Sequence, residues 1–557
     1  MCAAASEDAE LRVPVLVVGG SLVGLTTALL LRRHGVDVLA VERHSGTAIH
    51  PRAGHFNLRT VEILRSLGLE QEVRRSSERS YPPDGGISNV ESLAGREIAN
   101  YFDNLNDGVE QFSPTIRLFL DQDALEPMLR DHATQAGAQL LYRTEATALQ
   151  QDSDGVSVIV RDLESGAERR IRADYVVAAD GNRSPIREQL GIAMHGHGVL
   201  SNSATIYFRA EADLEPLLRG RNQGVQYVTS PLLRGFFRLN RAGNGGFLAV
   251  NLIGDTARPE IVAAYPDAPW ANVAEGITEE RALELLRAAI GVPGMPLVIT
   301  DIAPWQAVAD CAERFQDGRV FLAGDAAHVV PPNGGFGGNM GIQDAHNLAW
   351  KLALVLRGEA GPTLLDSYDT ERRAVGGLTV EQSYTRYVTR VAPYIGTEGM
   401  QPLVDDLHLE IGYRYNSPAV IAEPGTEPLL HTHPAESHGE PGSHAPHVVL
   451  SRDGASISTL DLFGTNYVVL AGPDGARWCA AFTAAAAHLG IAVDAHRVGA
   501  DGLTDPNGGF LDAYGINPAG GSVVRPDGFV GWRTSQPEGA DDARAREVLE
   551  LLLCRSR

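Results

Sequence analysis

The 557-residue chain has few cysteines, a deficit of basic residues and no long uninterrupted apolar segment. Its four cysteines lie far apart, which argues against a disulfide framework or a zinc site and fits a reducing compartment. Lys and Arg number 47 against 70 Asp and Glu, and the resulting net charge of -23 argues against a nucleic-acid partner. No apolar run approaches the roughly 20 residues that cross a bilayer. We therefore expect a cytoplasmic protein without a membrane or nucleic-acid partner.

The chain opens with a segment that alternates between strand and helix patterns. In "VLVVGGSLVGLTTALLLRRHGVDVLAVER" (15–43), an apolar run precedes Gly19, and leucines then recur at helical spacing. Gly35 ends this predicted helix before a second apolar run. The order is typical of a βαβ unit and predicts a parallel sheet. The length of the whole chain predicts about three domains of ordinary size.

The glycines of this unit match a dinucleotide-binding fingerprint with one letter changed. Gly19 would form the tight turn and Gly24 the close contact of helix and strand, while Ser21 stands where the middle glycine is expected. Backbone amides at the helix start can bind a pyrophosphate. Glu42, about 20 residues further on, can bind ribose hydroxyls and argues against a 2′-phosphate, although an ordinary βαβ turn is the alternative. The predicted cofactor contacts are Gly19, Ser21, Leu22, Val23, Glu42 and Arg43.

Two more motifs place acids and glycines after buried strands. In "YVVAADGNRSPIR" (175–187), Asp180-Gly181 follows an apolar run and precedes a helix. In "RVFLAGDAAHVVPPNGGFGGNMGIQDAHNLAWKLALVLRG" (319–358), Asp325 follows another buried strand. The later glycines allow a flat ring to lie against backbone, and a helix from about Met340 would direct its positive end toward that ring.

With all three motifs in this order, the chain resembles the class A FAD-dependent aromatic hydroxylases of the para-hydroxybenzoate hydroxylase type, from about Arg12 to Arg373. The stretches "VERHSGTAIHPRAGHFNLRTVEILRSLGL" and "DSYDTERR" are similar to actinobacterial hydroxylases of aromatic polyketides. The resemblance implies an α/β fold: a doubly wound, Rossmann-like FAD-binding domain with an inserted antiparallel substrate sheet, followed by a thioredoxin-like α/β domain. That last domain has no Cys-x-x-Cys, so we predict no redox role for it.

These expectations divide the chain into discontinuous domains. Short strands separated by Gly and Asn turns between residues 203 and 253 predict the antiparallel sheet. The FAD-binding domain would comprise residues 1–85, 113–200 and 301–395, and the substrate-binding domain residues 86–112 and 201–300. A linker at 396–445 would precede the thioredoxin-like domain at 446–557.

The resemblance also assigns residues to FAD. Asp325 would bind the ribityl hydroxyls, Asp180 would take part in binding FAD and the reduced nicotinamide, and Gln122 would reach the flavin. Helix capping, packing and a solvated helix start are the respective alternatives. Arg52 would lie near the flavin and the pyrophosphate, rather than in a surface ion pair. Pro332 would stiffen the approach to the reactive flavin face, and the residues predicted at the flavin pyrimidine are Gly337, Gly338, Asn339 and Met340.

We predict that Arg52, Pro332 and Arg414 act in the reaction. Arg414, between two tyrosines in "EIGYRYNSP", would favour a substrate phenolate if its segment folds over the cleft; a solvated side chain is the alternative. Aromatic residues of the inserted sheet should line the substrate pocket, and the candidates are Tyr227, Phe237 and Trp305. The segment "HTHPAESHGEPGSHAPH" is a Pro/Gly loop, and we predict no metal site in it.

The resemblance implies a flavin-dependent monooxygenase that uses FAD, NADPH or NADH as a transient reductant, and O2. Oxygen transfer would proceed through a C4a-hydroperoxyflavin to a phenolic aromatic substrate, which we expect to be polycyclic and derived from a polyketide. A Baeyer–Villiger oxygenase and a single-ring phenol hydroxylase on the same scaffold are the alternatives, and a binding protein with a vestigial flavin site is a more distant one. We expect a monomer or a homodimer.

Overall fold

The opening apolar run forms β1 (Leu11–Val18), the centre of an eight-stranded sheet. In this computed structural model, residues 11–50, 52–221, 224–254, 271–536 and 539–555 are described. The sheet's other strands are β2 (Val38–Val41), β7 (Gln139–Leu141), β8 (Thr144–Asp152), β9 (Gly155–Asp162), β10 (Glu168–Ala178), β16 (Gln316–Asp317) and β17 (Val320–Leu322). The order is β16-β17-β10-β1-β2-β7, with β9 and then β8 attached to β10. Strands β1, β2, β7, β10 and β17 run parallel, and the parallel pairing of β1 with β2 is what the βαβ order of the opening segment predicts.

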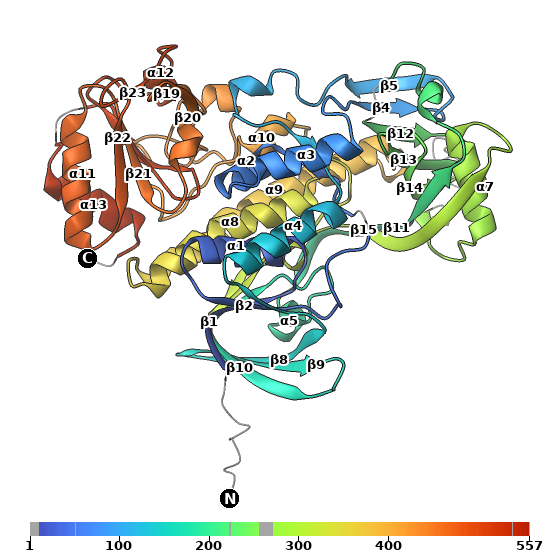
Figure 1. The fold of residues 1–557 in the computed structure, drawn as a ribbon, viewed down its shortest axis with the longest axis horizontal. Helices are drawn as coiled ribbons and strands as arrows, with labels where there is room; N and C mark the ends of the chain where they lie inside the picture. Colours follow the sequence, from blue (N-terminus) through green and yellow to red (C-terminus); the bar gives the residue numbers. More distant parts are fainter. Residues whose placement is uncertain (1–10, 51, 222–223, 255–270, 537–538, 556–557) are drawn as a thin grey trace, which may run out of the picture.

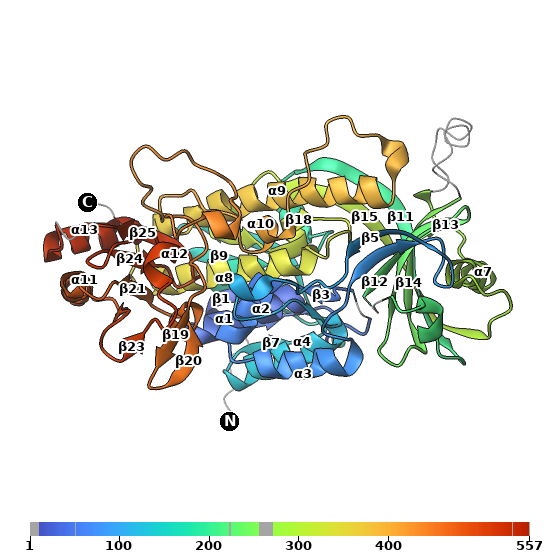
Figure 2. The same ribbon diagram turned by 90° about the horizontal axis from the view of Figure 1, so that it is seen from above.

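Helices pack on this sheet and extend away from it. They are α1 (Leu22–Arg33), α2 (Leu58–Ser66), α3 (Glu70–Ser80), α4 (Gln122–Gln135), α5 (Pro185–Gln189), α8 (Gly337–Leu356), α9 (Asp366–Arg390) and α10 (Asp406–Glu410). Helix α1 contacts both α4 and α8. Helices α8 and α9 run side by side along the long axis of the molecule, as Figures 1 and 2 show. None of the helices in the described part of the chain is both long and apolar enough to span a membrane.

A second eight-stranded sheet lies at the far end of α9, on the right of Figure 1. Its strands in spatial order are β18 (His328–Val329), β15 (Leu297–Ala312), β11 (Met194–Ala210), β14 (Gly245–Ile253), β13 (Leu233–Leu239), β12 (Val225–Thr229), β4 (Ile87–Val90) and β5 (Glu97–Phe102). All pairings are antiparallel except that of β12 with β4. Helix α7 (Glu279–Ile290) covers one face with a shared apolar core. The stretch 87–116 has no regular strand pattern in its sequence, yet it contributes the two strands β4 and β5. Pairing of β4 with β12 satisfies the hydrogen-bonding groups of the backbone there, whatever the side-chain pattern.

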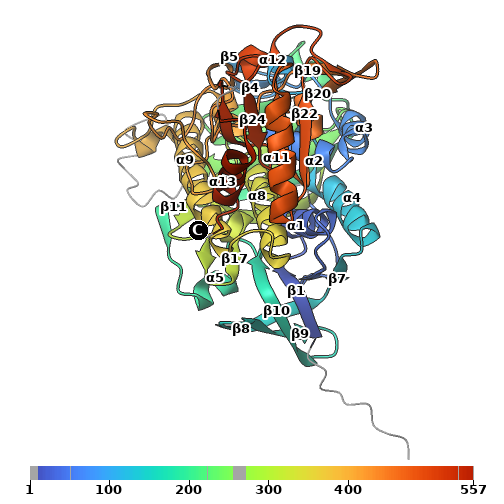
Figure 3. The same cartoon turned by 90° about the vertical axis from the view of Figure 1, so that its left-hand side faces the viewer.

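The C-terminal region forms two further sheets. A three-stranded sheet contains β19 (Val449–Arg452), β20 (Ala455–Ser458) and β23 (Leu503–Thr504). A four-stranded sheet in the order β22-β21-β24-β25 contains β21 (Tyr467–Ala471), β22 (Val493–Arg497), β24 (Gly521–Val524) and β25 (Val530–Thr534). Its helices are α11 (Ala476–Leu489), α12 (Phe510–Ala513) and α13 (Asp542–Leu552), and α11 and α13 face the viewer in Figure 3. The core under them includes Trp350 and Leu354 of α8, so this region shares a core with the first domain.

Candidate functional site

The first glycine turn lies against the end of β10. Gly19 has a φ of +111°, and a Cβ there would lie 2.1 Å from the carbonyl oxygen of Ala179. A Cβ at Gly24 would lie 1.8 Å from the carbonyl oxygen of Gly19. Both positions need glycine because backbone approaches backbone. Parallel pairing of β1 with β10 thus brings the predicted Asp180-Gly181 motif beside the predicted pyrophosphate turn.

The Gly324-Asp325 turn and the start of α8 meet the same helix end. A Cβ at Gly324 would lie 2.8 Å from Val23 Cγ2, and one at Gly341 would lie 2.4 Å from that methyl group. A Cβ at Gly338 would lie 3.0 Å from Leu22 Cδ2. The three motifs, each more than a hundred residues from the next in sequence, therefore lie around the start of α1.

Asp325 places a carboxylate beside the start of α1. Its side chain is exposed, yet the surrounding protein raises the pKa of its carboxyl by desolvation, with His328 and Arg52 acting in the opposite direction. The carboxylate is thus accessible although many protein atoms surround it. This arrangement suits hydrogen bonds from ligand hydroxyls, the role predicted for Asp325. Arg52 is exposed and lies close enough to act electrostatically on Asp325.

Asp180 and Glu42 flank the glycine turn from two strands. Asp180 Oδ2 accepts a hydrogen bond from Ile186 N at 3.2 Å, and burial raises the pKa of its carboxyl. Its Oδ1 is buried without a partner among the described residues. Glu42 Oε2 accepts from Gly20 N at 2.7 Å, which holds this carboxylate beside the turn. Arg43, next to it, is exposed.

Ser21 and Gln122 are joined through a residue that the sequence analysis missed. Glu126 is fully buried, and its Oε1 accepts hydrogen bonds from Ser21 Oγ, from Leu22 N at 2.8 Å and from Gln122 Nε2 at 2.6 Å. Its Oε2 accepts from Ala48 N at 2.6 Å. The available signal was the spacing: Glu126 follows Gln122 by four residues, so both lie on one face of α4.

The loop before α8 is fixed by backbone and amide hydrogen bonds. The carbonyl of Pro332 accepts from Gly335 N at 3.0 Å. Asn339 Nδ2 donates to the carbonyl oxygens of Gly335 at 2.6 Å and His55 at 2.9 Å. Gly337 and Gly338 are partly accessible at the first turn of α8, whereas Asn339 and Met340 are buried. The accessible glycines leave backbone open to a flat ligand at the positive end of a 20-residue helix.

These features fit FAD. Glycines stand where a Cβ would collide with backbone, Asp180 keeps an unpartnered buried oxygen, and Asp325 places an accessible carboxylate at depth. The residues that would hold the cofactor come from β1, β2, β10, α4 and the loops before and at the start of α8.

One face of the second sheet is directed toward this region. Tyr227 and Phe236 are cross-strand partners on β12 and β13, with ring centroids 5.9 Å apart. Trp305 of β15 is partly accessible, and its Nε1 donates to Thr205 Oγ1 at 3.0 Å. Asn333, in the loop before α8, donates from Nδ2 to the Tyr227 hydroxyl at 3.3 Å. Tyr227 and Trp305 thus lie on a common, aromatic face that contacts the predicted flavin loop.

Phe237, predicted as a substrate contact, does not lie on that face. Successive residues of a strand point to opposite sides of a sheet. Phe237 is fully buried in the core under α7, with its ring centroid 6.1 Å from that of Phe208. Phe236 occupies the accessible side instead. Because the two phenylalanines are adjacent, the sequence does not show which of them faces the site. The pairing of β13 with β12 and β14 decides it.

A cation other than the predicted Arg414 reaches the aromatic face. Arg390, at the end of α9, lies 5.7 Å from the ring centroid of Tyr227 and 4.8 Å from that of Tyr101. Its pKa is raised because, against the opposing desolvation, Tyr227 attracts and hydrogen-bonds the guanidinium. Helix periodicity alone could not identify it, since only the length and direction of α9 bring residue 390 to the sheet.

Arg414 is engaged elsewhere. Its Nη1 donates to Glu440 Oε2 at 2.6 Å, and its Nη2 to the carbonyl of Pro441 at 3.2 Å. The side chain is buried against the segment 430–441, and the structure does not bring it together with the other predicted site residues. The arginine therefore forms a structural ion pair with Glu440. This differs from the expectation that its segment would present a free cation to the substrate.

Comparisons with known proteins identify the family of the chain. Residues 12–383 match the model of the FAD binding domain family, and residues 438–555 match the aromatic-ring hydroxylase C-terminal family. The chain is 52% identical over 550 residues to 4-methyl-5-nitrocatechol 5-monooxygenase of Burkholderia sp, with 98% of each chain covered. It is 40% identical to aklavinone 12-hydroxylase RdmE of Streptomyces purpurascens, over 98% of this chain and 99% of that protein. The solved structure of aklavinone-11 hydroxylase with FAD and aklavinone superposes with a TM-score of 0.89 at 38% identity, covering 98% of this chain and all of the other.

Proposed function

Because this chain belongs to the FAD-dependent aromatic-ring hydroxylases and is an FAD-dependent aromatic monooxygenase, we propose that it hydroxylates a phenolic ring bound between the flavin loop and the aromatic face of the second sheet. The observation that carries the proposal is the contact of Arg390 and Asn333 with Tyr227, which joins that face to the loop before α8. FAD, once reduced by NADPH or NADH, would activate dioxygen, and dioxygen would supply the oxygen atom that is transferred.

The residues of the chain would orient the substrate and favour its ionised form. Partly accessible aromatic rings, Phe236 and Trp305 among them, can stack on a flat substrate and exclude water. The guanidinium of Arg390 lies where it would stabilise a phenolate, because a cation lowers the pKa of an adjacent phenol. An ionised ring is richer in electrons and reacts faster with an electrophilic oxygen.

The substrate that we propose first is a polycyclic phenol of polyketide origin. It is supported by the series of aromatic side chains along the face and by similarity to a structure that contains aklavinone. The second candidate is a single-ring catechol or nitrophenol, and the 52% identity to a nitrocatechol monooxygenase favours it. We also infer that the C-terminal domain is thioredoxin-like, because a parallel pair, β21 and β22, is followed by an antiparallel pair, β24 and β25, and a final helix.

A substrate panel tests the proposal. Purified holoenzyme is mixed with polycyclic polyketide phenols, nitrocatechols and simple phenols, and NADPH or NADH oxidation and product mass are recorded. We expect one class to stimulate cofactor oxidation and to gain one oxygen atom with its ring intact. Ring expansion or opening of a ketone substrate would replace the proposal by a Baeyer–Villiger reaction. If no phenol of the three classes stimulates cofactor oxidation, the proposal is refuted.

A further inference from the structure

A group of buried charges lies where the C-terminal domain meets α8 and α9. We call Asn347, Lys351, Glu371, Arg525 and Asp527 the interdomain cluster. All five are at most 1% exposed. The first three come from α8 and α9, and the last two from the turn between β24 and β25. Two anions thus meet two cations in a region from which water is excluded.

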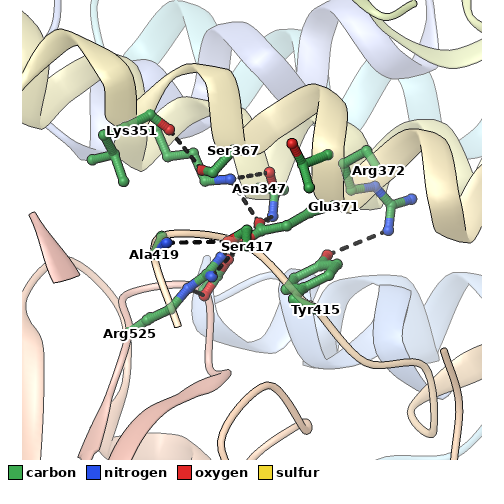
Figure 4. Close-up of polar contacts among 12 residues, drawn as sticks. Asn347, Lys351, Ser367, Glu371, Arg372, Tyr415, Ser417, Ala419 and Arg525 are labelled. Carbon is green, nitrogen blue, oxygen red and sulfur yellow. Dashed lines mark hydrogen bonds and ion pairs between the residues drawn. The ribbon is translucent and has the colours of Figure 1, made fainter. Parts of the chain in front are cut away.

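Glu371 is the centre of this cluster. Its carboxylate receives two hydrogen bonds from Arg525, with Nη1 2.5 Å from Oε1 and Nη2 2.9 Å from Oε2. Lys351 Nζ donates to Oε2 at 2.7 Å, and Ser417 Oγ donates to Oε1 at 2.6 Å. Figure 4 shows Arg525 approaching Glu371 from the C-terminal domain, opposite the helices that carry Lys351 and Asn347. Both carboxylate oxygens therefore accept hydrogen bonds from the C-terminal domain and from a second donor.

Arg372, the residue of α9 that follows Glu371, contacts the residues that hold the predicted flavin site. Arg372 Nε donates to Asp344 Oδ1 at 2.7 Å, and its Nη2 donates to the carbonyl of Met340 at 3.2 Å. Asp344 Oδ2 in turn accepts from Gly324 N at 3.0 Å and pairs with His328 Nε2 at 2.7 Å. Although burial opposes it, the contacts with His328 and Arg372 lower the pKa of Asp344. A charged carboxylate thus holds the backbone of the turn that carries Asp325.

We propose that the C-terminal domain positions the flavin site: Arg525 fixes Glu371, and the same turn of α9 then sets Arg372, Asp344 and the Gly324-Asp325 turn. Adjacent helical residues point about 100° apart, so one turn can bind two different partners. Rotation or displacement of this turn would move both contacts together. Arg525, Glu371, Arg372 and Asp344 are positioning residues in this account, because none of them has to touch the cofactor.

The strength of the coupling follows from burial. Removing one partner of a buried ion pair leaves an uncompensated charge, which is far more costly than losing an exposed pair. Without Arg525, Lys351 is the cationic partner that Glu371 retains among the described residues, and the helix turn gains freedom to adjust toward that lysine. The effect would reach Gly324 through two side chains, Arg372 and Asp344.

The experiment compares three variants of the full-length holoenzyme. Arg525→Gln removes the cation. Arg525→Lys keeps the charge but cannot form the bidentate pair of hydrogen bonds with Glu371. Arg533→Gln is the matched control, since Arg533 belongs to the same domain and pairs with Glu423 at 2.5 Å, away from α9. FAD dissociation is measured by flavin fluorescence on dilution, and backbone hydrogen exchange is measured for residues 320–330 and 438–555.

We expect Arg525→Gln to weaken FAD binding about tenfold and to increase exchange in residues 320–330, because loss of the pair transmits to the turn. Arg525→Lys should give a smaller change, and Arg533→Gln should leave both unchanged. Increased exchange confined to residues 438–555, with unaltered FAD dissociation, would overturn the proposal. If Arg525→Gln fails to fold, the same two measurements are made on Ser417→Ala. This variant removes one neutral donor to Glu371 and should destabilise the protein less. No substrate is required, so failure here is distinguishable from failure of the proposed hydroxylation.

Discussion

The hydroxyl of Ser21 donates a hydrogen bond to the buried carboxylate of Glu126. Ser21 is the one residue that departs from the glycine fingerprint, and this contact gives it a function. Glu126 also accepts from the first amide of α1, Leu22 N, at 2.8 Å. The serine therefore belongs to a set of hydrogen bonds that fixes the helix start, and it is more than a small residue tolerated there.

Substitution at position 21 tests how closely the cofactor approaches this residue. Ser21→Gly should retain FAD, because glycine allows the same backbone and Leu22 N still anchors Glu126. Ser21→Leu should lose it, since a bulky side chain would occupy the approach to the pyrophosphate. Flavin absorbance per protein after purification measures the outcome. A leucine variant that keeps its flavin would show that position 21 does not face the pyrophosphate.

Glu126→Gln should destabilise the protein and weaken FAD binding. All the groups around the carboxylate are donors, so the amide NH2 of glutamine must face another N–H or O–H. A buried donor left without an acceptor costs about 1–3 kcal/mol. Urea unfolding of the variant and of the exposed control Glu110→Gln measures the difference. Equal stability of the two variants would argue against a structural role of the charge.

The two adjacent phenylalanines of β13 provide a matched pair. Phe237→Ala should lower the free energy of unfolding by about 3–5 kcal/mol, because it leaves a cavity under α7, and should leave KM little changed. Phe236→Ala should raise KM for the active phenol with a smaller loss of stability, since its ring is partly accessible. Thermal unfolding and steady-state kinetics distinguish them. The reverse pattern would mean that the register of β13 is shifted by one residue.

Arg390→Gln should raise the pH at which turnover begins. The guanidinium favours a phenolate, so its removal raises the pKa of a bound phenol and moves the rising limb of kcat to higher pH. Arg390→Lys retains a positive charge and should shift the limb less. Profiles of kcat against pH measure this effect. A profile that does not move in Arg390→Gln would place the substrate hydroxyl away from this residue.

The stability of the protein should fall on acidification below pH 6.5. Burial, with Arg357 and Arg33, lowers the pKa of His34 to about 4, and burial with Arg117 lowers that of His55 to about 3. The unfolded chain, whose histidines titrate near pH 6.5, then binds more protons than the folded one. Each such histidine costs at most about 1.4 kcal/mol per pH unit between pH 6.5 and its folded pKa.

The matched test of this pH dependence is His34→Gln. The carbonyl of residue 34 keeps its hydrogen bond from Arg357 in that variant, so only the titrating ring is lost. Urea unfolding at pH 5 and pH 7 should show a smaller difference than in the parent. The exposed His488→Gln should behave as the parent does. An unchanged difference in His34→Gln would mean that this ring is protonated in the folded state.

Local patterns carried much of the prediction. The helix expected between Gly19 and Gly35 is α1 (Leu22–Arg33), and the helix expected from about Met340 is α8 (Gly337–Leu356), because apolar periodicity and the glycines at helix ends are local properties. Confirmed predictions include the FAD-dependent aromatic hydroxylase family and its cofactor. The roles of the individual cofactor residues stay predictions.

The sequence by itself determined the turns that carry the predicted cofactor contacts. Each of these turns has a glycine or an acidic residue directly after a strand, and this is a local pattern that can be read from the order of residues. Only the tertiary structure decided which side of β13 faces the site, which arginine reaches it and what the C-terminal domain contacts. Phe236 is chosen over Phe237 by strand register, and Arg390 over Arg414 by the length of α9 and the competing Glu440. The pairing of Glu371 with Arg525 joins residues 154 positions apart, and no local pattern encodes a contact that the packing of two domains creates.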